Sequence, residues 1–242
     1  MLDVEKVYVV HYTRLIERRM RLEGQFRRLD IEAEYITADD KDDLSAAQIK
    51  ESYVNNEESY NNTILKVYGK ESNPFRRMSD AEISCTIKHY NAIKKIGEEC
   101  EEYGLIFEDD VILVDNFVDH FNSYLKRTPT DWDAIFMGSC CDLRISPPGG
   151  DLEQVAFLKK HPATKCADGY MLKRGLAQKI TKTMMPFNVI SDWELGYQLA
   201  LHGANVYWWE PPLLYQGSES GLFQSTLECA RCKRRGCNGD CK

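Results

Sequence analysis

The feature that most constrains the fold of this chain is an acidic triplet inside an apolar segment. Apolar residues 105–107 follow a glycine and run directly into Glu108, Asp109 and Asp110, and apolar residues resume at Val111. A short apolar run of this kind is typical of a buried strand. Buried carboxylates are unfavourable unless they are paired or bind a metal ion. Because ligands of open α/β sheets bind beyond the carboxyl ends of the strands, the segment predicts a strand that ends at a ligand site.

The spacing within the triplet predicts that its side chains point in two directions. Residues two apart on an extended backbone point the same way, so Glu108 and Asp110 are expected to share a target while Asp109 points elsewhere. Carboxylate oxygens suit Mg²⁺ or Mn²⁺, which proteins commonly share with substrate phosphates. A solvated acidic turn is the alternative, and the triplet alone leaves it open.

The order of the remaining segments predicts an α/β fold. A buried first strand at 7–10, a helix at 14–29 that begins after Thr13, and a second strand at 31–38 favour a right-handed parallel crossover. The polar stretch 41–77 predicts only short helical or irregular pieces. Further strands are expected at residues 132–137, 155–158, 167–172 and 205–209, with some of them antiparallel.

Two capping boxes predict helix starts at Ser79–Glu82 and at Ser191–Glu194. His89 lies near the apolar stripe of the first helix, where a packing role is the alternative to a functional one. In the second helix the cap would occupy Glu194 and leave Asp192 without a predicted partner. Its structural alternative is to complement the helix dipole.

Bulk properties limit the class of protein. A length of 242 residues is enough for one α/β domain, or at most two small ones. The net charge of −7 argues against nucleic-acid and anionic-membrane binding. No apolar run is long enough to span a bilayer, and the N-terminus shows no signal-peptide pattern, so a cytoplasmic location is expected.

The cysteines fall into two groups. Five are scattered through the body and are expected to be reduced, partly buried thiols: Cys85, Cys100, Cys140, Cys141 and Cys166. Four crowd the C-terminal end with spacing compatible with a four-thiolate zinc site: Cys229, Cys232, Cys237 and Cys241. A reduced tail without structure and an oxidised, cross-linked tail remain open. We therefore expect a domain over residues 1–227 and a basic, cysteine-rich tail over 228–242.

Four segments in a fixed order carry a family resemblance: residues 7–19, residues 78–85 with His89, residues 107–111, and the stretch from Tyr170 through Asp192 to Pro212. Together they resemble glycosyltransferase family 25, which holds bacterial lipooligosaccharide galactosyltransferases and procollagen galactosyltransferases. The resemblance covers about residues 7–227. It implies a GT-A fold, with a Rossmann-like mixed sheet flanked by helices.

The resemblance also implies an activity. The expected enzyme is an inverting, metal-dependent hexosyltransferase that uses a UDP-sugar donor and Mn²⁺ or Mg²⁺. Galactose is the first expected sugar, with glucose and N-acetylglucosamine behind it, and the acceptor is a hydroxyl of a glycan or of a hydroxylysine-type protein. The alternative is a non-catalytic member of the fold that binds a glycan or a protein, with the cysteine-rich tail as docking element.

Site roles follow from the matched positions. Asp110 is expected to bind the metal, and Glu108 to approach the metal and the ribose or donor sugar. Asp39 is expected near the uracil and His89 near the donor. Asp192 matches the acid that deprotonates the acceptor hydroxyl, and the preference for it over Glu194 rests on the predicted cap.

Three further residues are donor-site or metal candidates. Asp109 belongs to the acidic triplet, and Arg18 lies in an Arg-bearing helix that could meet phosphate, with a solvated helix face as the alternative. Many GT-A enzymes offer a C-terminal histidine to the metal. Here that region carries Gln216, and either its carbonyl oxygen or a water molecule is expected to take the place of the histidine.

Overall fold

A seven-stranded mixed sheet forms the centre of the molecule. The computed structural model describes residues 1–69, 74–145 and 154–224, so the predicted tail zinc site lies outside the described residues. The strand order is β2-β1-β3-β7-β5-β8-β6. Pairing is parallel for β1 with β2 and β3 and for β5 with β8, and antiparallel where β7 meets β3 and β5 and where β6 meets β8. The strands are β1 (Val7–Val10), β2 (Glu34–Ile36), β3 (Tyr103–Glu108), β5 (Ala134–Phe136), β6 (Ala156–Lys159), β7 (Gly169–Lys173) and β8 (Val206–Trp209).

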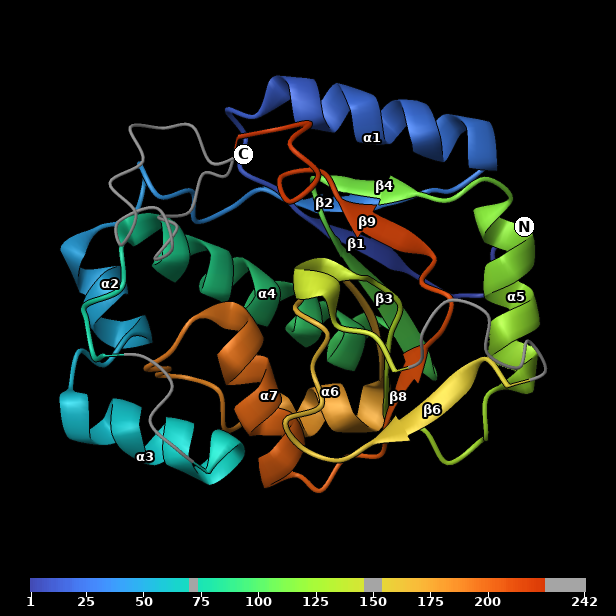
Figure 1. Cartoon of the computed structure of the whole chain (residues 1–242). Helices are drawn as coiled ribbons and strands as arrows, with labels where there is room; N and C mark the ends of the chain where they lie inside the picture. Colours follow the sequence, from blue (N-terminus) through green and yellow to red (C-terminus); the bar gives the residue numbers. More distant parts are fainter. Residues whose placement is uncertain (70–73, 146–153, 225–242) are drawn as a thin grey trace.

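Helices cover both faces of this sheet (Figure 1). One face packs against α1 (Ile16–Leu29) and α5 (Phe117–Arg127), and the other against α4 (Asp80–Glu99), α6 (Arg174–Ile180) and α7 (Ser191–Leu201). The polar stretch 41–77 contains α2 (Ala46–Ser52) and α3 (Glu57–Tyr68), which lie against α4 and α7 respectively. The expected mixed sheet flanked by helices is therefore confirmed. Among the described residues, no helix combines the length and apolarity needed to cross a membrane.

The first strand shows why the apolar runs are continuous. Val7 and Val9 belong to the core beneath α1 and α5, whereas Tyr8 and Val10 belong to the core beneath α4, α6 and α7. Alternate side chains of a strand point to opposite faces, so a sheet covered on both sides needs apolar residues at every position. Ligand-binding groups are consequently confined to the strand ends.

The acidic triplet separates two strands, β3 and β4. β3 ends at Glu108, and after the turn at Asp109 and Asp110 the chain enters β4 (Val111–Leu113), which pairs antiparallel with β9 (Leu214–Gln216) in a separate two-stranded sheet. The backbone N–H of Gly217 donates to the carbonyl oxygen of Asp110 at 2.8 Å. This pairing brings Gln216 beside the acidic triplet. The strand β9 was not predicted from the sequence.

The helix starts agree with the sequence in one case and differ in two. At α4 the capping box is confirmed: the Ser79 hydroxyl accepts from the Glu82 N–H, and the Glu82 carboxylate accepts from the Ser79 N–H. At α1 the N-cap is Leu15 rather than Thr13, whose N–H and hydroxyl bond Asp40 instead.

The second capping box is wrong. The N-cap of α7 is Ile190, and it makes no side-chain cap hydrogen bond. Ser191 is already helical, and the Glu194 carboxylate reaches forward to accept from Gln198 Nε2 at 2.8 Å. The sequence has the serine and glutamate of a capping box, but the serine lies one residue inside the helix and therefore cannot cap it.

Candidate active site

Three carboxylates lie near one another at one edge of the sheet, where β3 and β5 end and β7 begins. Glu108 is the last residue of β3 and Asp110 follows it, while Asp168 precedes β7, whose antiparallel course brings it alongside. The Glu108 N–H donates to the carbonyl oxygen of Asp168 at 3.0 Å. Gly138, beyond β5, leaves room for this arrangement, because a Cβ there would lie 2.1 Å from Asp168 Oδ1.

Two of these carboxylates present an oxygen without a partner. Among the described residues, Asp110 Oδ1 and Asp168 Oδ2 are buried side-chain oxygens with no hydrogen bond. Their other oxygens accept from the backbone N–H groups of Ser218 at 3.2 Å and Gly169 at 2.9 Å. Burial and the charge of Glu108 raise the pKa of Asp110 to about 6 and the pKa of Asp168 well above its usual range. Carboxylates with repelling charges suit a hard divalent cation. In the described residues the oxygens of Glu108, Asp110 and Asp168 do not all lie within 4.8 Å of one another, so a shared cation would require them to move closer together.

Glu108 is held from two sides. Its Oε1 lies 3.3 Å from His89 Nε2, and its Oε2 accepts from Gln216 Nε2 at 3.0 Å. His89 Nδ1 lies 2.9 Å from the Tyr170 hydroxyl, so both ring nitrogens have partners in the protein. The Gln216 carbonyl oxygen accepts from the Cys140 thiol at 3.1 Å. In this arrangement His89 and Gln216 fix the position of Glu108.

Asp109 points away from the other two acids, toward the first strand and helix. Its carboxylate oxygens lie 2.8 Å from His11 Nδ1 and 3.0 Å from Arg18 Nη1. The Arg18 side chain is buried, so it does not belong to a solvated helix face. Arg18 Nη1 also lies 3.8 Å from Asp110 Oδ2. The guanidinium therefore offsets charge on both aspartates from the wall of the site.

A cleft opens in front of the acidic triplet. Besides the three acids, its lining includes Tyr12, Arg18 and Lys41 on one side, Ser84, Cys85 and Lys88 of α4 on another, and Gln216 and Ser218. Asp39 and His89 are absent from this lining within the described residues.

The loop after β2 borders the cleft and is tied to α4. Lys88 Nζ donates to Asp40 Oδ1 at 2.6 Å and to the His11 carbonyl oxygen at 2.8 Å, and both charged side chains of this pair are buried. The Asp39 carboxylate accepts from Gln48 at 3.1 Å and from Asn91 at 3.0 Å. The position of Asp39 is thus fixed before any ligand binds.

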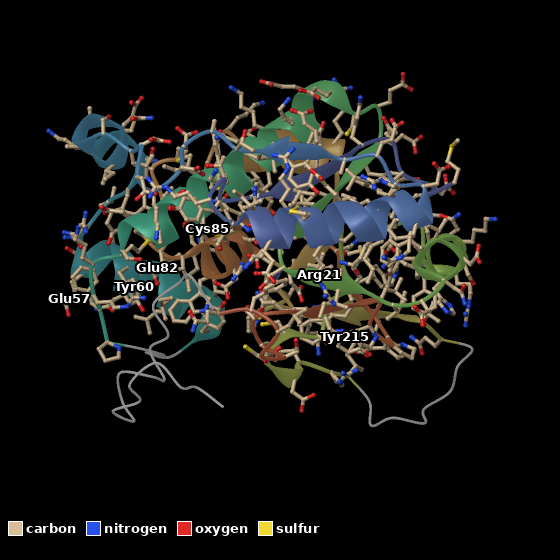
Figure 2. The ribbon with its side chains drawn as sticks, turned by 90° about the horizontal axis from the view of Figure 1, so that it is seen from above. Arg21, Glu57, Tyr60, Glu82, Cys85 and Tyr215 are labelled. Carbon is tan, nitrogen blue, oxygen red and sulfur yellow. The ribbon has the colours of Figure 1, made fainter. Side chains whose placement is uncertain are left out.

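Asp192 lies near the acidic corner, at the second residue of α7. The preceding residue, Ser191, has its hydroxyl 3.9 Å from the thiol of Cys85, a cleft-lining residue on α4 that is labelled in Figure 2. Burial and the charge of Glu108 raise the pKa of Asp192 to about 6. The helix dipole was expected to favour the ionised form, but these two effects outweigh it. A general base works best with a pKa near the operating pH, so the shift suits that role.

Glu194 occupies a different environment. It is buried on the side of α7 that faces a separate hollow bordered by Asn188 and Thr63. Burial raises its pKa to about 7, and its carboxylate interacts with Gln198 and the backbone of Asn188. The sequence-based reason for preferring Asp192 was wrong, but the positions of the two acids favour the same choice.

Three residues beside the site, Asp168, Lys88 and His11, were not predicted as site residues from the sequence. Asp168 fell inside a strand expected at residues 167–172, whereas β7 begins one residue later, at Gly169. An acid within a predicted buried strand is the same signal that drew attention to the triplet at 108–110. His11 and Lys88 carried no such signal, because their partners are distant in sequence.

Most of the chain is similar to known proteins. The family model described as Glycosyltransferase family 25 (LPS biosynthesis protein) matches residues 4–194. Procollagen galactosyltransferase 1 of Danio rerio is 23% identical over 183 residues, which cover 74% of this chain and 28% of the relative. A glycosyltransferase 25 family member of Drosophila melanogaster is 27% identical over 206 residues (84% and 27%).

A viral protein is similar over a comparable length. The procollagen lysyl hydroxylase and glycosyltransferase of Acanthamoeba polyphaga mimivirus is 21% identical over 216 residues, which cover 86% of this chain and 22% of the relative. The chain therefore spans about a quarter of the length of the curated relatives it matches.

Proposed function

The chain belongs to glycosyltransferase family 25, and from this premise we propose that it transfers a hexose from a UDP-sugar to a hydroxyl group, with inversion. Galactose is the first candidate sugar, because similar proteins are named procollagen galactosyltransferases. The acceptor is a glycan or a hydroxylysine-type side chain. The observation that carries the proposal is that Glu108 and Asp110 line a cleft, with a buried oxygen of Asp110 and one of nearby Asp168 that have no hydrogen-bond partner among the described residues.

We propose that Asp110, Asp168 and Glu108 hold Mn²⁺ or Mg²⁺ together with the donor diphosphate. When bound, such a cation would neutralise the charge that develops on the departing diphosphate. Arg18 adds positive charge beside Asp110, and Lys41 lines the cleft with its ammonium 5.0 Å from the centre of the Tyr12 ring. Asp39, fixed by Gln48 and Asn91, is proposed to lie toward the uracil.

Asp192 is the proposed general base. As the acceptor oxygen forms its bond to the anomeric carbon, the bond from that carbon to the diphosphate oxygen breaks on the opposite face, and the hydroxyl proton passes to the Asp192 carboxylate. With a pKa of about 6, the carboxylate is mostly ionised at pH 7 and can accept the proton. Displacement from the opposite face inverts the configuration of the sugar.

A donor hydrolysis screen tests this function before an acceptor is known. The full chain is incubated with Mn²⁺ and, separately, UDP-galactose, UDP-glucose and UDP-N-acetylglucosamine, and released UDP is measured. We expect slow hydrolysis that is fastest with UDP-galactose and is lost in Asp110→Asn. Binding of UDP without turnover of any donor, across a broad acceptor panel, would instead support the non-catalytic alternative.

A further inference from the structure

Three cysteines that are separated in sequence meet near the cleft. Cys140 and Cys141 lie in η1 (Cys140–Asp142), the short 3-10 turn that follows β5, and Cys166 lies shortly before β7. The Cys140 and Cys141 sulfur atoms are 3.6 Å apart, and those of Cys141 and Cys166 are 3.8 Å apart. All three sulfur atoms lie within 4.8 Å of one another. The pairing of β5 with β7 brings the two loops together.

The sulfur separations fit a tetrahedral metal ion. A zinc–sulfur bond of about 2.3 Å in tetrahedral geometry places neighbouring sulfur atoms roughly 3.8 Å apart. Two of the observed separations match this value, and the third needs only a small side-chain movement to do so. Three protein ligands with solvent in the fourth position is an established zinc arrangement. Thiolate ligands select Zn²⁺ and other soft ions over the hard Mg²⁺ and Mn²⁺.

The backbone supplies a second, independent observation. The backbone φ angles are 56° at Cys141, 54° at Asp142, which follows it in η1, and 60° at Cys166. These values lie in the left-handed region, which residues other than glycine seldom adopt and which is found preferentially at ligand sites. Two of the three thiols are therefore presented by an unfavourable backbone conformation that the surrounding fold maintains.

The surroundings favour a cation. Asp168 places negative charge near the Cys140 thiol. The Cys141 N–H donates to a Glu219 carboxylate oxygen at 2.7 Å, which adds another acid to the rim. A bound divalent cation would stabilise the thiolates and offset these charges, while the thiol protons are released to solvent.

From this geometry we infer that Cys140, Cys141 and Cys166 form a site for a thiophilic divalent cation such as Zn²⁺, distinct from the carboxylate site. The site adjoins the donor end of the cleft, because the Cys140 thiol donates to Gln216, which in turn contacts Glu108. Metal binding would release the Cys140 proton and with it this hydrogen bond to Gln216.

Cobalt spectroscopy tests the inference. The probe is Co²⁺, added under a phosphine reductant to the full chain in which all four tail cysteines are replaced (Cys229→Ser, Cys232→Ser, Cys237→Ser and Cys241→Ser), so that a tail site cannot contribute. We expect one equivalent to give the sulfur-to-cobalt charge-transfer band and the visible bands of a tetrahedral ion, and Zn²⁺ to displace it. Co²⁺ bound by carboxylates alone gives no such sulfur band. Cys85 is the one thiol whose sulfur lies, among the described residues, within 4.8 Å of ligand atoms of His89 and Glu108, so Cys85→Ser is included and should leave the band unchanged.

Matched variants assign the band to its ligands. Cys166→Ser and Cys141→Ser should each abolish or strongly shift the sulfur band, with circular dichroism confirming that the fold is retained. Cys100→Ala, which alters a buried thiol beside Gly104, should leave the band unchanged. The inference is overturned if the tail variant gives no sulfur band, if Cys166→Ser leaves the band unchanged, or if mass spectrometry finds two of the three cysteines joined in a disulfide.

Discussion

Asp110 and Asp192 have the same raised pKa, about 6, for the same physical reasons. Asp110 is buried and Asp192 is half-buried, and each feels the charge of Glu108. The roles proposed for them differ because their partners differ. Asp110 has one oxygen without a partner and an arginine close by, whereas Asp192 lies at the start of a helix and accepts from the Trp193 N–H at 3.0 Å.

Replacing Asp192 tests its role as the base. We expect Asp192→Asn to lower kcat by about 10²–10⁴-fold, because general-base assistance is lost while the residue keeps its size. The affinity for UDP with Mn²⁺ should be unchanged, since the carboxylates at 108–110 are intact. Steady-state kinetics and calorimetry measure the two quantities. Glu194→Gln is the matched control, and a comparable loss of kcat in that variant would contradict the assignment.

The raised pKa of Asp192 also predicts a pH dependence. A carboxyl with a raised pKa keeps its proton to higher pH, so the base becomes unavailable as the pH falls through about 6. At saturating Mn²⁺, kcat should fall about tenfold per pH unit below that point. At limiting Mn²⁺ the fall should be steeper, because protons then compete with the cation at Asp110. An activity plateau that extends to pH 5 would show that no group of this pKa is required.

At the scale of elements, α4 holds the two sides of the site together. One helical turn presents Ser84 and Lys88 to the loop after β2 and His89 to the end of β3. The Ser84 hydroxyl donates to the Asp39 carbonyl oxygen at 2.6 Å. Burial alone would raise the pKa of Asp40, but hydrogen bonds from Lys88 and Thr13 lower it, so the pair is ionised at neutral pH.

Breaking this buried pair should destabilise the protein. Lys88→Met leaves Asp40 as a buried charge without its cation, a change that typically lowers the free energy of unfolding by about 3–5 kcal/mol. Urea denaturation at pH 7 measures the difference. Lys94→Met is the control, because Lys94 is exposed and its pair with Glu98 spans 3.8 Å. Its effect should stay within about 0.5 kcal/mol. Equal effects in the two variants would contradict the structural role of the pair.

The stability of this pair also depends on pH in a defined direction. Because the pKa of Asp40 is lowered in the folded state, its contribution is present above the pKa of the unfolded chain and is lost as the pH falls toward the folded value. The difference between Lys88→Met and the unmodified chain should therefore shrink in acid.

At the scale of the whole molecule, local patterns in the sequence predicted the fold better than the site. The apolar runs at 7–10 and 105–107 and the capping box at Ser79 are local signals, and each corresponds to an observed element. The pairing of β4 with β9 and the position of Asp168 depend on contacts between distant segments. Sequence periodicity carries no information about such contacts.

The error at α7 has a different origin. A serine and a glutamate three residues apart satisfy the capping-box pattern wherever they occur, but the cap forms only if the serine lies just outside the helix. Here the helix begins at Ser191 itself, and Gln198 offers Glu194 a partner one turn further along. A capping-box pattern therefore predicts a cap only when the first residue of the helix is also known.

The central claim is that the acids at the end of β3 hold a divalent cation together with a nucleoside diphosphate. Calorimetric titration of the full chain with UDP, with and without Mn²⁺, tests it most directly. The account predicts that UDP binds tightly only in the presence of Mn²⁺, and that Asp110→Asn abolishes this dependence and weakens binding. Equal UDP affinity with and without Mn²⁺, or an unchanged titration in Asp110→Asn, would contradict it.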